Sequence, residues 1–171
     1  MNTQIKIVKG DITRINADII VNAANNHLRG GGGVDGAIHK AAGPTIKEEC
    51  RKIGYCNTGE AVITSAGNLE ANYIIHTVGP VYSKNNNEQQ KLLYNAYYNS
   101  LQLGTGYNVK SIAFPSISTG IYGYPFEEAS TIALEAVNDF IISNNHYAEI
   151  IFVLFSQKDY LSFIELKNKI L

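Results

Sequence analysis

Residues 30–39 read Gly-Gly-Gly-Gly-Val-Asp-Gly-Ala-Ile-His, four glycines followed at once by a helical pattern. Glycine has no Cβ and adopts positive φ without steric cost, so such a run lets a ligand approach the main chain closely. Val34, Ile38 and Ala42 then recur at helical spacing, which predicts a helix that begins directly after the glycines. Unpaired N–H groups and the positive dipole at a helix N-terminus attract phosphate. The stretch therefore predicts a site for a phosphate-bearing ligand.

The composition excludes several classes of function. At 171 residues the length fits one domain, expected over 1–171, and the formal net charge is −1. Lys and Arg form no basic stripe, so an extended nucleic acid is not expected as a partner. Because no apolar run approaches ~20 residues, neither a membrane span nor a secretory leader is predicted. Cys50 and Cys56 do not stand with histidines at zinc spacing, so we expect two reduced thiols in a cytoplasmic protein.

Short β-rich segments alternate with helical patterns along the chain. The first strand alternates with period two, as at the edge of a sheet, whereas the others are continuous apolar runs typical of strands covered on both faces. This order predicts an α/β fold, a three-layer α/β/α sandwich with a central mixed, largely parallel sheet. The predicted strands are 5–9, 19–21, 61–64, 74–78, 112–114 and 150–155, and the predicted helices are 34–42, 45–53, 88–103, 126–143 and 159–170.

Glycine, proline and aspartate residues predict where several of these helices begin and end. Gly43-Pro44 predicts the end of the first helix. Pro125 is expected at the first helical position of the fourth helix, ahead of two glutamates in its first turn. Asp159 is expected to be the N-cap of the last helix.

Three loops that follow predicted strands are rich in small or polar residues: 22–26, 116–124 and 156–158. Ligands of open α/β sheets bind at the carboxyl ends of the strands, so these loops are candidates for one site. The first leads into the glycine run, and the second contains Gly120 and Gly123 before another helix. Two phosphate-type loops that face one crevice favour a diphosphate over a monophosphate.

A dinucleotide-binding fingerprint is a competing interpretation of the glycines. Gly31, Gly33 and Gly36 match its G-x-G-x-x-G spacing. The fingerprint requires a strand immediately before the glycines and an acidic residue at the end of a second strand, and the chain has neither. Lys40 also lies too far along the chain to be a P-loop lysine. A nicotinamide-dependent dehydrogenase is therefore not favoured.

Five ordered segments together resemble a macrodomain, and more narrowly the MacroD-type ADP-ribosylhydrolases. The resemblance extends from about Ile5 to the last helix, which is almost the whole chain. It implies the macrodomain fold and a cleft for ADP-ribose, with no cofactor and no metal, because the zinc-ligand insertion of a microbial sister class is missing. The segments are 10–13 (Gly-Asp-Ile-Thr), 20–25 (Ile-Val-Asn-Ala-Ala-Asn), 30–39, 75–80 (Ile-His-Thr-Val-Gly-Pro) and 114–125 (Phe-Pro-Ser-Ile-Ser-Thr-Gly-Ile-Tyr-Gly-Tyr-Pro).

The resemblance implies that Asp11, Ile12 and Phe155 hold the adenine. The Asp11 carboxylate would accept a hydrogen bond from the exocyclic amine, and the Ile12 N–H would meet a ring nitrogen. Phe155, at the end of the last strand, would lie against the face of the base. The alternatives are that Asp11 only caps a turn and that Phe155 belongs to the core.

The same resemblance places the diphosphate between the two glycine loops. It would be bound mainly by main-chain N–H groups, with Tyr122 packed beside the distal ribose. Gly120 and Gly123 would allow an approach that a Cβ blocks. The residues implied are Ser118, Thr119, Gly120, Ile121 and Tyr122 on one side, and Gly33 and Val34 on the other.

Asn25 and Asp35 are the implied catalytic pair. Asn25 would hold the hydroxyls of the distal ribose, and Asp35 would orient a water for attack on the anomeric carbon or the ester carbonyl. Since Asp35 lies in the first turn of a helix, the dipole is expected to keep its pKa low and to make it a weak base. His39, four residues later, is expected to pack or hydrogen-bond behind Asp35, and His76 to be a core histidine.

The resemblance leaves three functions from different classes open. The first is a hydrolase that removes mono-ADP-ribose from acidic side chains of proteins and also deacetylates O-acetyl-ADP-ribose. The second is a module that binds ADP-ribose without turnover, and the third is a phosphatase for ADP-ribose 1″-phosphate. Asn25, Asp35 and the loop 120–123 favour the hydrolase. The expected partners are ADP-ribose and ADP-ribosylated proteins, and a monomer is expected.

Overall fold

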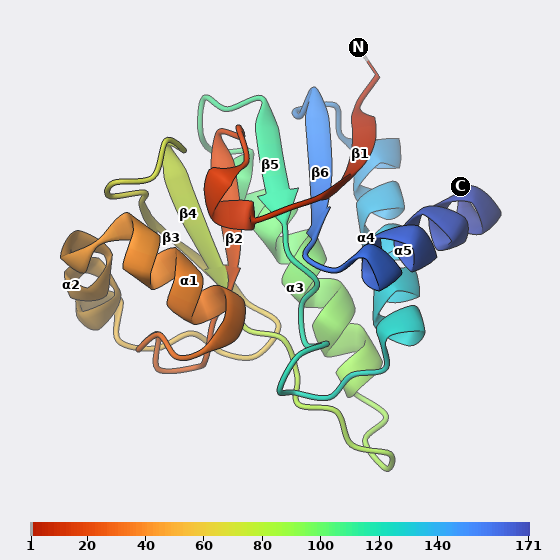
Figure 1. Cartoon of the computed structure of the whole chain (residues 1–171), viewed down its shortest axis with the longest axis horizontal. Coiled ribbons are helices and arrows are strands. Elements are labelled where there is room, and N and C mark those ends of the chain that lie inside the picture. Colours follow the sequence, from red (N-terminus) through yellow and green to blue (C-terminus); the bar gives the residue numbers. More distant parts are fainter. Residues whose placement is uncertain (1) are drawn as a thin grey trace.

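A computed structural model describes residues 2–171, and it alternates strands and helices along the chain (Figure 1). The strands are β1 (Gln4–Lys9), β2 (Ile19–Ala23), β3 (Ala61–Ser65), β4 (Tyr73–Thr77), β5 (Ser111–Phe114) and β6 (Glu149–Leu154). The α-helices are α1 (Gly33–Ala42), α2 (Pro44–Ile53), α3 (Gln89–Gly104), α4 (Phe126–Ser143) and α5 (Gln157–Ile170). A short 3₁₀ helix, η1 (Ile12–Arg14), follows β1 and was not predicted.

The strands form one mixed sheet in the order β1-β6-β5-β2-β4-β3. Every neighbouring pair is parallel except β3 and β4, which are antiparallel. The predicted place of β1 at an edge is confirmed. The expectation that β3 is covered on both faces is wrong: β3 forms the other edge, and most of its residues are only half-buried. An antiparallel edge strand needs cover on one face only, so its apolar composition did not distinguish it from a central strand.

Helices cover both faces of the sheet, as the predicted three-layer sandwich requires (Figure 1). Ile20, Ile74 and Ala113 lie side by side on neighbouring strands and belong to the core beneath α1 and α2. Their chain neighbours point the other way, and Ile19 and Ile75 belong to the core beneath α3, α4 and α5. Successive strand residues point to opposite faces, so the continuous apolar runs supply both cores at once.

The helix ends agree with the sequence in one case and differ in two. Gly43 ends α1 and Pro44 opens α2, as predicted. The N-cap of α5 is Ser156, whose Oγ accepts a hydrogen bond from the Asp159 N–H at 3.1 Å. Asp159 therefore lies in the first turn, where a carboxylate is favoured by the helix dipole. Pro125 is the N-cap of α4 rather than its first helical residue.

Candidate functional site

Two adjoining cavities, of about 340 and 480 Å³, lie at the carboxyl ends of the strands. Both are lined by the start of α1 (Gly33 and Val34) and by the loop after β5 (Ser116 and Gly120), so they form one continuous cleft. Each residue that the sequence assigned to the ligand lines one of them. The larger cavity has Asp11, Ile12, Thr119 and Phe155, the smaller has Asn25, Asp35, Ser118, Ile121 and Tyr122, and Gly33, Val34 and Gly120 line both.

The larger cavity is bordered by an aromatic ring and a carboxylate. Phe155 follows β6 and is 83% exposed, so the alternative that it belongs to the core is wrong. Asp11 caps η1, since its Oδ1 accepts from the Thr13 N–H at 2.9 Å and from the Thr13 hydroxyl at 2.7 Å. The hydroxyl bond is the main cause that lowers the pKa of Asp11. The capping alternative is therefore correct as a contact, yet the same carboxylate lines the cavity and can still accept there.

The start of α1 presents backbone N–H groups to both cavities. Its N-cap, Gly32, has no side chain to bond them, and the first turn of a helix lacks intrahelical acceptors. Gly33 has φ +58°, a conformation that favours glycine, and a Cβ there would meet no protein atom. This geometry can bind an anionic group, as the glycine run predicted.

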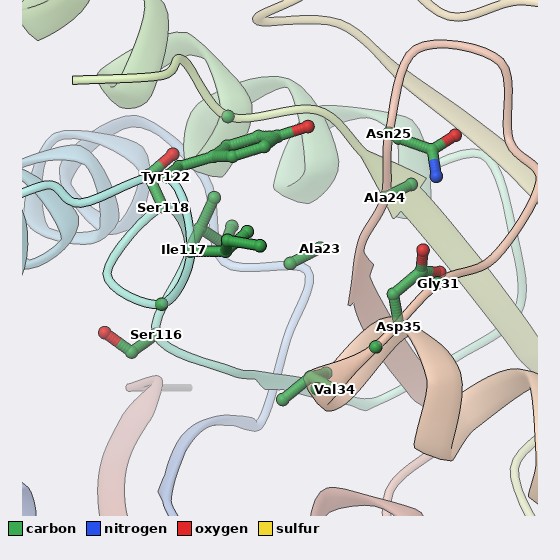
Figure 2. A pocket seen from close by; sticks show the side chains of 15 residues that line it. Ala23, Ala24, Asn25, Gly31, Val34, Asp35, Ser116, Ile117, Ser118 and Tyr122 are labelled. Atoms are coloured by element: carbon green, nitrogen blue, oxygen red, sulfur yellow. The ribbon is translucent and has the colours of Figure 1, made fainter. Parts of the chain in front are cut away.

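The loop after β5 forms the opposite wall. Figure 2 shows Ile117, Ser118 and Tyr122 across the smaller cavity from Asn25 and Asp35. The Tyr124 N–H donates to the Ser118 carbonyl at 2.9 Å and the Gly123 N–H to the Gly120 carbonyl at 3.0 Å, so the loop is held in a tight turn. Ser118 has φ +68°, unusual for a residue other than glycine, and its hydroxyl has no hydrogen-bond partner among residues 2–171. Such strain often accompanies ligand-binding loops.

Asn25 ties the glycine run to the loop after β2. Its Nδ2 donates to the Gly30 carbonyl at 2.8 Å, and its Oδ1 accepts from the Arg29 N–H at 3.1 Å. The side chain is half-buried on the wall of the smaller cavity. Asn25 therefore shapes the loop, and its second amide proton remains for a ligand hydroxyl.

Asp35 lies on the same wall of the smaller cavity as Asn25 and is only 7% exposed (Figure 2). Its Oδ1 accepts from Asn22 Nδ2 at 2.8 Å and lies 3.4 Å from His39 Nε2. Its Oδ2 lies on the side of Gly31, which also lines the cavity. The expected low pKa is wrong. Burial is the largest influence and raises the pKa of Asp35, although Asn22 and His39 act in the opposite direction.

Behind Asp35, three side chains approach one another closely enough to be considered as metal ligands. Within residues 2–171, ligand atoms of His39, Cys50 and His76 lie within 4.8 Å of one another. His76 is fully buried, and its Nε2 lies 2.9 Å from the Thr64 hydroxyl and 3.8 Å from Cys50 Sγ. His76 is thus the hydrogen-bonded core histidine that the sequence predicted. Both cysteines are free and buried.

Sequence reasoning missed three residues of this region. Asn22 was predicted in the polar loop 22–26, but it lies within β2, which extends to Ala23, and it is fully buried there. Gly79 lies against the loop after β5, where a Cβ would collide with the Ser118 hydroxyl. Asp159 lines the larger cavity from the first turn of α5.

Comparison with known proteins assigns the family. A family model described as Macro domain matches residues 21–133. The chain belongs to the macrodomain family. This macrodomain is 55% identical over 164 residues to a Macro domain-containing protein of Caldanaerobacter subterraneus, covering 94% of this chain and 93% of that protein. It is 50% identical over 163 residues to a protein of Escherichia fergusonii named O-acetyl-ADP-ribose deacetylase, covering 93% and 92%.

Solved structures give the same assignment. A macrodomain of Oceanobacillus iheyensis with MES bound superposes with a TM-score of 0.94 at 44% identity, over 98% of this chain and 92% of that one. A macrodomain of Trypanosoma brucei in complex with ADP-ribose has a TM-score of 0.88 at 38% identity, over 94% and 68%. The resemblance to MacroD-type macrodomains and the predicted fold are confirmed. In residues 2–171 no helix has both the length and the apolar character to cross a membrane.

Proposed function

We propose that this macrodomain binds ADP-ribose along the whole cleft and hydrolyses esters of its distal ribose. The observation that carries the proposal is the position of Asp35, a buried carboxylate that lines the smaller cavity, whereas Phe155 and Asp11 line the larger one. With adenine in the larger cavity, the diphosphate would lie at the start of α1 and the distal ribose beside Asn25 and Asp35. The relatives named O-acetyl-ADP-ribose deacetylase and the neighbours with bound ADP-ribose support ADP-ribose as the ligand.

The proposed reaction uses water as the nucleophile. Oδ1 of Asp35 is held by Asn22, while Oδ2 lies beside the cavity-lining Gly31 and would accept a proton from the attacking water. The raised pKa of Asp35 favours this role, because a carboxylate of raised pKa is a stronger base. The water oxygen attacks the ester carbonyl or the anomeric carbon, the ester bond breaks, and the products are a carboxylate and ADP-ribose.

We infer two substrate classes that share this bond. O-acetyl-ADP-ribose is an acetate ester of the distal ribose, and mono-ADP-ribosylated Asp or Glu is an ester of the same sugar. Ile121 lines the smaller cavity and is 99% exposed, so we infer that this end of the cleft opens to solvent. An open end fits the acetyl group as well as the side chain of a modified protein. We also infer that residues 1–171 act as one monomeric domain, and the two free thiols support a cytoplasmic location.

The test is hydrolysis of both esters by the wild-type protein. We expect release of ADP-ribose from a glutamate-linked mono-ADP-ribosylated protein and release of acetate from O-acetyl-ADP-ribose. Mass spectrometry detects both products. Release from the acetyl ester alone would reject the protein substrate. Binding of ADP-ribose without release from either ester would replace the hydrolase with a reader module. Phosphate release from ADP-ribose 1″-phosphate is the third assay, and activity confined to that substrate would favour a phosphatase.

A further inference from the structure

A chain of buried polar side chains runs behind Asp35, from β3 through β4 and β2 to α1. The Thr64 hydroxyl lies 2.9 Å from His76 Nε2, and His76 Nδ1 lies 3.1 Å from Asn22 Nδ2. The same Asn22 nitrogen lies 2.8 Å from Asp35 Oδ1. All four residues are at most 7% exposed. Buried polar groups of this kind are costly unless each is paired, so the directions of the hydrogen bonds matter.

The hydrogen-bond partners indicate which atom donates and which accepts at each step from Thr64 to Asp35. The Thr64 hydroxyl donates its one proton to the Ser65 carbonyl at 2.9 Å, which leaves its oxygen as an acceptor for His76 and favours the tautomer with the proton on Nε2. Nδ1 of His76 then has a free lone pair and accepts from Asn22 Nδ2. The other proton of the Asn22 amide is donated to Asp35 Oδ1. Each link therefore determines the next, and the chain ends on the carboxylate.

The protonation states of the neighbouring residues are compatible with these hydrogen bonds. Burial, with a smaller effect of His39 on α1, lowers the pKa of His76 to about 3, so the ring is neutral. On α2, burial is the main cause that raises the pKa of Cys50 to about 11, so its thiol is also neutral. The titratable groups that face Asp35 are thus His39 on its own helix, Cys50 and neutral His76.

We propose that Thr64 and His76 are positioning residues for the reaction: they orient the Asn22 amide so that it donates to Asp35 Oδ1 and leaves Oδ2 free for water. An Asn22 amide turned the other way would direct its oxygen at the carboxylate. The Asp35 carboxylate repels that oxygen from one side, and an acceptor at His76 Nδ1 repels it from the other. Thr64 makes Nδ1 the acceptor, so it adds the second of these two constraints. The inference rests on the proposed hydrolase function, because it assigns a role in turnover.

Two substitutions of His76 separate positioning from packing. His76→Asn places a carbonyl oxygen near the position of Nδ1 and keeps an acceptor for Asn22, whereas His76→Gln keeps only a donor for Thr64. We expect His76→Gln to lower kcat by about 10- to 100-fold, the scale of a lost hydrogen bond to a charged group, and His76→Asn to lose less. A packing role predicts the opposite order, because Gln replaces more of the ring volume. Equal losses, or a larger loss for Asn, would overturn the proposal.

The pH profile provides a readout that packing does not affect. The Asn22 hydrogen bond stabilises the ionised form of Asp35, so its loss raises the pKa of Asp35 further. The acid limb of the pH profile of kcat should therefore move to higher pH in His76→Gln and in Thr64→Val. Thr64→Ser keeps the hydroxyl, so its acid limb should stay where it is in the wild type. Thr77→Val is the matched control, since Thr77 is a buried threonine of β4 whose hydroxyl donates to the Glu60 carbonyl. An unmoved limb in Thr64→Val would contradict the proposal.

A measurement without substrate separates this proposal from the proposed function. NMR of the ¹⁵N-labelled His76 ring in the wild type should find the proton on Nε2, and in Thr64→Val this preference should be lost. A proton on Nδ1 of the wild type would overturn the positioning chain whatever the turnover. A wild type with the expected ring proton but no hydrolysis of either ester would instead reject the hydrolase and, with it, the role in turnover.

Discussion

Replacing Asp35 with alanine is expected to reduce kcat for ester hydrolysis by about 10²–10⁴-fold, the usual cost of removing a positioned general base or electrostatic group. The carboxylate is a buried acceptor that lines the smaller cavity, and its Oδ2 lies beside Gly31, which lines the same cavity. Affinity for ADP-ribose should stay within about tenfold, or 1.4 kcal/mol. Removal of a negative charge near the diphosphate offsets part of any lost contact with the ribose. Steady-state kinetics and calorimetry on the same preparation measure both effects.

Asp35→Asn is the matched variant, because it keeps the volume and an acceptor for Asn22 while it removes the base. It should lose turnover as severely as alanine with a smaller change in melting temperature. Burial raises the pKa of Asp35, so wild-type kcat should decline on acidification at a pH above the ordinary range for an aspartate. Normal turnover in either variant would dismiss Asp35 as the catalytic residue.

Replacing Gly120 with valine is expected to weaken ADP-ribose binding by at least about 100-fold, or 2.7 kcal/mol. Gly120 lines both cavities at the point where they join, and a Cβ there would meet no protein atom within 4 Å. The new side chain would thus occupy space that the diphosphate needs. Gly120 is not among the glycines with positive φ, so the backbone accepts valine without strain and the melting temperature should change little.

Gly106→Val is the control for this substitution. Gly106 is exposed in the loop after α3, has no positive φ, and a Cβ there would make only an ordinary contact with the Leu103 carbonyl. It should bind ADP-ribose like the wild type. If Gly120→Val keeps wild-type affinity while it remains folded, the diphosphate does not pass between the two loops.

Much of the fold could be predicted because it depends on local pattern. The buried strands read as apolar runs, and Gly43-Pro44 marks the boundary between α1 and α2 in the chain itself. The cleft could be predicted for a similar reason: carboxyl ends of parallel strands meet at one edge, so loops 22–26 and 116–124 had to approach each other. The antiparallel β3 was less predictable, since its pairing partner and exposure depend on its place in the sheet.

The pKa of Asp35 and its hydrogen-bond partners could not be predicted from the local sequence pattern. Its place in the first turn of α1 predicts a low pKa, but the pKa depends on how deeply the neighbouring elements bury the side chain. Asn22, His76 and Thr64 come from three strands, and their alignment depends on the register Asn22↔His76 and on the pairing of β3 with β4. The capping of α5 by Ser156 instead of Asp159 is a smaller example, because either residue type suits that position.

Calorimetry of the wild-type protein with ADP-ribose and with AMP tests the central claim, that one ligand extends through both cavities. AMP can fill the adenine cavity, but it leaves the smaller cavity and one of the two phosphate positions empty. We expect micromolar affinity for ADP-ribose, on the order of −8 kcal/mol, and binding of AMP at least about tenfold weaker. Equal affinities for the two nucleotides would contradict the account, because the cavity that contains Asn25 and Asp35 would then contribute nothing to binding.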